Sequence, residues 1–174
     1  MSSLKKALTQ AGIYDTFAAA VQPPTRAALA EPNAESWFPG AVVEDIWQTL
    51  VKKYGPQQLS DINYLVAKQS FGPVVMPVIK VALALTGNSP ASVAARLESM
   101  LKLAIRPVKI IWHATDANSG TITIQYPRPI VLVAEHAWGG VFRFMFEITG
   151  RQGTVERFEP LEGASQFRLT LRWK

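Results

Sequence analysis

The chain has 174 residues, a formal net charge of +5 at pH 7, 48% hydrophobic residues and 18% charged residues. This composition is typical of a folded domain with an apolar core and excludes a disordered chain. With no cysteine and only two histidines, the sequence also excludes disulfides, thiolate metal centres, cysteine nucleophiles and histidine-rich metal cages.

The basic residues are scattered along the sequence. The only adjacent pairs are Lys5–Lys6 and Lys52–Lys53. Nucleic-acid-binding proteins concentrate such charge along one groove, so we expect no nucleic-acid partner. The apolar stretch 74–85 would reach only about 18 Å as a helix, against a hydrocarbon core of about 30 Å, so we expect no transmembrane segment. The N-terminus does not resemble a signal peptide, and we expect a cytoplasmic location.

Residues 1–35 are predicted to form a loosely attached helical arm. Apolar residues recur at helical spacing from Leu4 to Val21, and Pro23–Pro24 is predicted to end the helix. A polar loop follows, and residues 36–174 are predicted to form one domain.

Four helices are predicted at the start of that domain. The first spans 42–54 and ends at Gly55; the next two span 59–70 and 74–85, with a joint at Gly72–Pro73. Ser89 is predicted to cap the fourth, with Pro90 at its first helical position, and Arg106–Pro107 is predicted to end it.

The hydrophobic period then changes from 3.6 to 2. Residues 108–113 and 121–126 are predicted to form a β-hairpin, because a Gly/Asn/Asp-rich loop joins them. A helix is predicted over 130–148, and strands over 154–159 and 166–174. The natural arrangement is an α+β fold in which a helical layer packs on one face of a four-stranded antiparallel sheet.

The residues that could support catalysis do not converge in the sequence. His113 is predicted to face solvent from a strand, and a hydrogen-bonded structural role is favoured for His136, which lies beside Glu135. No metal-ligand or nucleotide-binding motif occurs, so we expect no metal site and no catalytic set. The Gly139–Gly140 pair is interpreted as a close helix packing contact.

Aromatic residues are the remaining feature, and they would suit an apolar pocket as well as an ordinary core. The residues that we predict to bind a ligand are Tyr64, Trp112, Tyr126, His136 and Phe142.

Several segments together resemble known proteins. They are Trp37-Phe38-Pro39, Tyr54-Gly55, Ser89-Pro90, Gly139-Gly140 with Gly150, and the closing run 167–173. In this order they resemble a group of uncharacterised, largely myxobacterial proteins. That group is similar to haem nitric-oxide-binding domains, vinyl-reductase-type small-molecule domains and TRAPP trafficking subunits.

The resemblance implies helices on an antiparallel sheet with room for a ligand between them. The haem-binding branch uses a helical histidine and a Tyr-x-Ser-x-Arg motif for the propionates. The nearest string here is Tyr126-Pro127-Arg128-Pro129, which lacks the serine and the spacing, so we expect no haem and no other cofactor.

The sequence therefore favours a non-enzymatic sensor or interaction domain that binds a small apolar ligand, a protein partner or a second copy of itself. Arg168, Arg172 and Lys174 would give the last strand either a surface for an acidic partner or simply a charged outer face. The alternatives are a small-substrate enzyme that uses His136 and Glu135, and a membrane-associated, trafficking-like adaptor.

Overall fold

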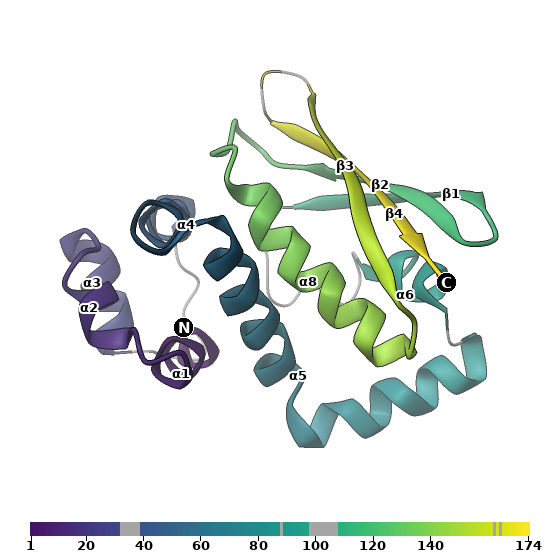
Figure 1. Ribbon diagram of the computed structural model, residues 1–174, viewed down its shortest axis with the longest axis horizontal. Coiled ribbons are helices and arrows are strands. Elements are labelled where there is room, and N and C mark those ends of the chain that lie inside the picture. The colour runs from purple at the N-terminus through teal and green to yellow at the C-terminus, as the bar shows by residue number, and fades with distance from the viewer. Residues whose placement is uncertain (32–38, 88, 98–107, 162, 164) are drawn as a thin grey trace. The chain divides into compact units, whose positions relative to one another are not determined.

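The computed structural model describes residues 1–31, 39–87, 89–97, 108–161, 163 and 165–174. The chain divides into two compact units (Figure 1). The helical unit comprises Met1–Gly72 and Val133–Val141, and the sheet unit comprises Pro73–Leu132 and Phe142–Lys174. Helices α5 and α8 contribute to both, and each unit is described by itself.

The helical unit contains short helices at its N-terminus followed by longer ones. Its elements are α1 (Ser2–Gln10), α2 (Tyr14–Ala18), α3 (Pro23–Ala30), α4 (Gly40–Tyr54), the first part of α5 (Pro56–Thr86) and the start of α8 (Ala134–Thr149). The predicted helix over 42–54 is confirmed by α4, which ends where Gly55 adopts φ +88°.

The predicted single helix from Leu4 to Val21 is wrong, because the chain turns at Gly12. Gly12 has φ +70°, and the N–H groups of Gly12 and Ile13 donate to the carbonyls of Thr9 and Leu8. This Schellman arrangement ends α1, and it needs a residue that adopts the left-handed region without strain. Gln22 is extended, as predicted for the residue before Pro23, so no helix continues through this point. The prediction missed that the two prolines then occupy the first turn of a new helix, α3, where their missing N–H groups cost nothing.

Residues 1–31 contribute side chains to the core of the helical unit. Leu8, Phe17 and Leu29 are fully buried in the same core as Leu50 and Leu59. Complete burial of such side chains contributes roughly 1.5–3 kcal/mol each. The predicted boundary at residues 35–36, like Trp37 and Phe38, lies outside the described residues, and the division into an arm and one domain stays a prediction.

The predicted helix packing at Gly139–Gly140 is confirmed in the helical unit. A Cβ atom on Gly140 would overlap the carbonyl oxygen of Ser60 and lie 2.7 Å from the backbone nitrogen of Tyr64. A Cβ atom on Gly139 would meet only the Ser60 hydroxyl, at an ordinary 3.6 Å. Helices α8 and α5 therefore approach so closely at Gly140 that only glycine fits.

We predict that Gly140→Ala lowers the free energy of unfolding by about 1–3 kcal/mol, because the added methyl group forces backbone to move. Gly139→Ala is the matched control, and we expect it to leave stability unchanged or raise it by up to about 1 kcal/mol through helix propensity. Urea denaturation of both variants measures the difference. Equal stability of the two variants would contradict the close contact.

The sheet unit is built on four antiparallel strands in the spatial order β1-β2-β4-β3 (Figure 1). The strands are β1 (Lys109–Asp116), β2 (Ser119–Gln125), β3 (Gly153–Leu161) and β4 (Gln166–Trp173). The predicted hairpin pairs Trp112 with Ile122, and Ile122 in turn pairs with Leu169 of β4. The predicted four-stranded sheet is confirmed within the described part of the chain.

The two faces of this sheet differ in polarity. Ile122, Ile124 and Leu169 are fully buried on one face, whereas Arg168 and Arg172 alternate with the buried residues and are exposed. Helices cover the apolar side: α6 (Pro90–Ala94) lies beside β2, and the ring of Phe146 on α8 fills the space over Gly153. The predicted α+β architecture is confirmed.

The two helices predicted over 59–70 and 74–85 are one continuous helix, α5, because an internal proline removes one hydrogen bond without having to end a helix. The predicted joint at Gly72–Pro73 coincides with the point where the chain passes from the helical unit to the sheet unit. The cap at Ser89 is confirmed, because its hydroxyl oxygen accepts the N–H of Ser92 at 3.1 Å. The continuation predicted up to Arg106 lies mostly outside the described residues.

Candidate functional site

The five predicted ligand-binding residues are divided between the two units. Tyr64 and His136 belong to the helical unit, whereas Trp112, Tyr126 and Phe142 belong to the sheet unit.

In the helical unit, both predicted residues have polar partners. The Lys68 ammonium donates to the Tyr64 hydroxyl at 3.1 Å and lies 5.4 Å from the centre of its ring. The Nε2 atom of His136 lies 3.2 Å from Oε1 of Glu135, and both side chains are 36% exposed. His136 lies one turn before Gly140 on the same face of α8. The favoured role of a hydrogen-bonded, structural histidine matches this geometry.

In the sheet unit, the three predicted residues pack with other rings. Trp112 lies against Trp173, with ring centroids 6.2 Å apart, and a Cβ atom on Gly120 would overlap its indole. Tyr126 meets the edge of Phe167 at 6.0 Å. Phe142 is fully buried. These contacts match the core interpretation of the aromatic residues, and ligand binding by them stays a prediction.

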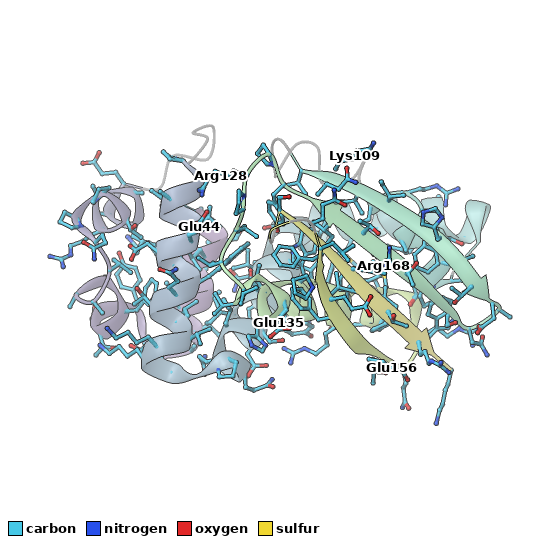
Figure 2. The ribbon with its side chains drawn as sticks, turned by 90° about the horizontal axis from the view of Figure 1, so that it is seen from above. Glu44, Lys109, Arg128, Glu135, Glu156 and Arg168 are labelled. Atoms are coloured by element: carbon cyan, nitrogen blue, oxygen red, sulfur yellow. The ribbon has the colours of Figure 1, made fainter. Side chains whose placement is uncertain are left out.

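The polar face of the sheet carries ion pairs between neighbouring strands. Arg172 Nε lies 2.6 Å from Glu156 Oε2, and Arg168 Nη1 lies 3.9 Å from Glu159 Oε2. Figure 2 shows Arg168 and Glu156 on these strands. Because both arginines have an acidic partner on β3, the pairs favour the interpretation of this face as a charged outer surface over that of an acidic-partner site. His113 is exposed, as predicted.

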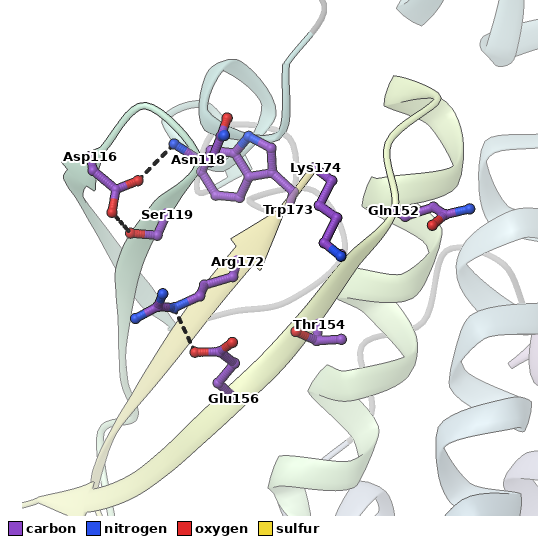
Figure 3. A pocket seen from close by; sticks show the side chains of 10 residues that line it. Asp116, Asn118, Ser119, Gln152, Thr154, Glu156, Arg172, Trp173 and Lys174 are labelled. Carbon is purple, nitrogen blue, oxygen red and sulfur yellow. Dashed lines mark hydrogen bonds and ion pairs between the residues drawn. The ribbon is translucent and has the colours of Figure 1, made fainter.

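A shallow depression of about 570 Å³ opens at the hairpin end of the sheet (Figure 3). The sequence did not predict it, because residues far apart along the chain form it. It is lined by Asp116, Asn118, Ser119, Gln152, Gly153, Thr154, Glu156, Arg172, Trp173 and Lys174.

The hydrogen bonds of the β1–β2 turn fix the wall of this depression. One carboxylate oxygen of Asp116 accepts the Asn118 N–H at 2.7 Å, and the other accepts the Ser119 hydroxyl at 2.6 Å. The Ser119 hydroxyl bond, followed by the Asn118 bond and the charge of Arg172, holds the pKa of Asp116 below its ordinary value. The signal in the sequence was the Asp-x-Asn-Ser turn, which we interpreted only as a turn.

The carboxylates that line the depression have partners within it. Asp116 is engaged by the turn, and Glu156 and Arg172 pair with each other. Among the described residues, no group of three metal-ligating side chains is present, and no helix is both long and apolar enough to cross a membrane.

We predict that Asp116→Asn destabilises the fold in a pH-dependent way. A depressed pKa means that ionised Asp116 stabilises the folded state above the unfolded-state pKa of about 3.9, and that this stabilisation is lost as the pH falls through the folded-state pKa. Melting temperatures from pH 2 to pH 7 should therefore differ most above pH about 5 and converge in acid.

Ser119→Ala is the second variant for this experiment. It removes the largest cause of the lowered pKa of Asp116. The loss of stability on acidification should therefore begin at a higher pH than in the unmodified chain. A difference between Asp116→Asn and the unmodified chain that stays constant over the whole pH range would contradict the assignment.

Comparison with known proteins identifies the fold. No protein-family model matches the sequence, and no curated protein is similar to it. Solved structures of H-NOX domains are similar over nearly the whole chain. An Fe(II) unliganded H-NOX protein from K. algicida is 12% identical, covers 99% of this chain and 94% of its own, and has a TM-score of 0.69.

Two further structures give the same result. An oxygen-binding H-NOX domain related to soluble guanylate cyclases is 14% identical, with a TM-score of 0.66 and coverage of 99% of this chain and 91% of its own. A mutant H-NOX domain from T. tengcongensis is 13% identical, with a TM-score of 0.58 and coverage of 99% and 94%. The chain has the H-NOX fold, which confirms the predicted likeness to haem nitric-oxide-binding domains; the other likenesses stay predictions.

Proposed function

We propose that this chain is a non-enzymatic sensor domain that binds a small apolar molecule. The observation that carries the proposal is the similarity to H-NOX domains over 99% of the chain. One of those domains is described as oxygen-binding and related to soluble guanylate cyclases, so the fold serves small-molecule binding elsewhere. A fold alone does not determine function, and the residues must supply the rest of the argument.

The positions of the titratable groups support a role without catalysis. General acid–base chemistry requires groups that converge on a reacting atom. His113 is exposed on the polar face of the sheet, and His136 belongs to the other unit, where Glu135 is its partner.

The aromatic residues of the sheet unit support an apolar ligand. Two groups of rings lie along the sheet. The first is Trp112 with Trp173. The second is Tyr126 with Phe167 and Phe158, in which the rings of Phe158 and Phe167 are stacked with centroids 4.9 Å apart. Trp112, Tyr126 and Phe158 are only half-buried, so each keeps surface that an apolar molecule could cover.

We predict that the purified chain retains an apolar molecule that native mass spectrometry detects and organic extraction releases. Trp112→Leu and Tyr126→Leu should each lower its occupancy, because both remove aromatic contact area. Ile111→Ala is the matched control, since Ile111 neighbours Trp112 on β1 but points to the opposite face. Absence of any retained molecule, or equal losses in all three variants, would argue against the proposal.

A second candidate is an enzyme that uses His136 and Glu135, favoured by their 3.2 Å contact. If the pair is structural, His136→Gln should lower the free energy of unfolding by about 0–1 kcal/mol, as expected for a partly exposed ion pair. The retained molecule should be recovered chemically unchanged from the unmodified chain and the variant alike. Conversion of that molecule by the unmodified chain but not by His136→Gln would favour the enzyme.

A further inference from the structure

We infer that this chain carries no resident haem, although the domains with the same fold include iron- and haem-containing proteins. The inference sharpens the proposed function, on which it rests, by removing one class of ligand. It is drawn from the positions of the chain's own donor side chains.

Few residue types can hold haem iron. Haem iron is held by an imidazole, a thiolate, a phenolate, or a thioether that acts together with histidine. The chain has no cysteine, two histidines and four tyrosines. All six of these side chains lie in the described ranges, so the donors can be taken one by one.

His113 lies on the wrong face of the sheet. It pairs with Thr121 of β2, which pairs with Thr170 of β4, and this row belongs to the polar face. The side chain is exposed, whereas the aromatic rings that would suit a porphyrin are on the opposite face. A porphyrin ligated by His113 would have its apolar faces against a polar, water-exposed surface, which is unfavourable.

His136 has its outer nitrogen already engaged. Nε2, the ring nitrogen farther from the backbone, lies 3.2 Å from the carboxylate of Glu135. Iron at this atom would have to displace the carboxylate. The other nitrogen, Nδ1, is next to the ring carbon that is bonded to Cβ, so a macrocycle bound there would be crowded by the backbone of His136 itself.

The tyrosine hydroxyls also have partners. The hydroxyl of Tyr14 donates to the Leu29 carbonyl at 3.4 Å, that of Tyr54 shares a 2.7 Å hydrogen bond with Thr16, and that of Tyr64 accepts from Lys68.

The fourth tyrosine, Tyr126, packs edge-on against Phe167 in the sheet unit. Two residues later, the Arg128 guanidinium donates to the Pro129 carbonyl of its own loop at 3.4 Å.

The test uses the full chain, produced in a host supplied with iron and 5-aminolevulinate, beside the K. algicida H-NOX domain as positive control. Haem content is measured as haem per chain after extraction, and the absorption spectrum reports the axial ligand. We expect the control to contain one haem per chain and this chain to contain far less. Hemin added to the purified chain should give no saturable one-to-one complex.

Matched variants make the result decisive. His113→Gln, His136→Gln and the double variant should take up the same small amount of hemin as the unmodified chain, with circular dichroism confirming that each is folded. One haem per chain would overturn the inference, whether the histidine variants lose it or retain it. The outcome is separable from the proposed function, because an extracted apolar molecule would stand without haem, and a bound haem would still be a sensor ligand.

Discussion

The alternation of apolar and polar side chains along the sheet is the constraint on which the sheet unit depends. Because successive residues of a strand point to opposite faces, Ile122 and Ile124 bury one face while Thr121 and Thr123 leave the other to solvent. A shift of register by one residue would expose the apolar set. The same alternation places the aromatic rings on one face of the sheet and the charged and titratable side chains on the other. His113 and the two Arg–Glu pairs lie on the polar face.

Close backbone contact is the corresponding constraint where elements meet. Gly140 lets α8 approach the backbone of α5, Gly120 makes room for the indole of Trp112, and Gly153 makes room for the ring of Phe146. In each case the missing Cβ atom is replaced by a neighbour from another element. Glycine is thus needed at these positions for space, whereas at Gly12 it is needed for a left-handed turn.

Periodicity was sufficient to predict most elements, because burial of one face leaves its period in the sequence. The hairpin, the last strand, α4 and the cap at Ser89 were all predicted correctly. The errors concern prolines and the N-terminus. A proline in the first turn of a helix and a proline that ends one look alike in sequence, so α3 was missed and α5 was predicted as two helices. Burial of Leu8 and Phe17 depends on partners some thirty to fifty residues away, such as Leu50 and Leu59, which local spacing cannot reveal.

The candidate site was less accessible to sequence reasoning for a related reason. Aromatic residues that line a pocket and those that fill a core recur in the sequence with the same spacing. The sequence could therefore select Trp112, Tyr126 and Phe142 as candidates, but it could not decide between a pocket and a core position for them. The depression beside Asp116 was missed because it joins the hairpin turn to the start of β3 and the end of β4, which are far from that turn in the sequence.

Sequence identity of 12–14% with a shared fold shows which property of the chain specifies architecture. The pattern of burial tolerates exchange of nearly every residue as long as each position keeps its polarity and approximate size. A ligand site has no such tolerance, because one imidazole or one guanidinium at one position cannot be replaced by its neighbour. The H-NOX fold can therefore persist while the groups that hold a cofactor are lost, and the donors, rather than the similarity of the backbone, decide which molecule such a domain binds.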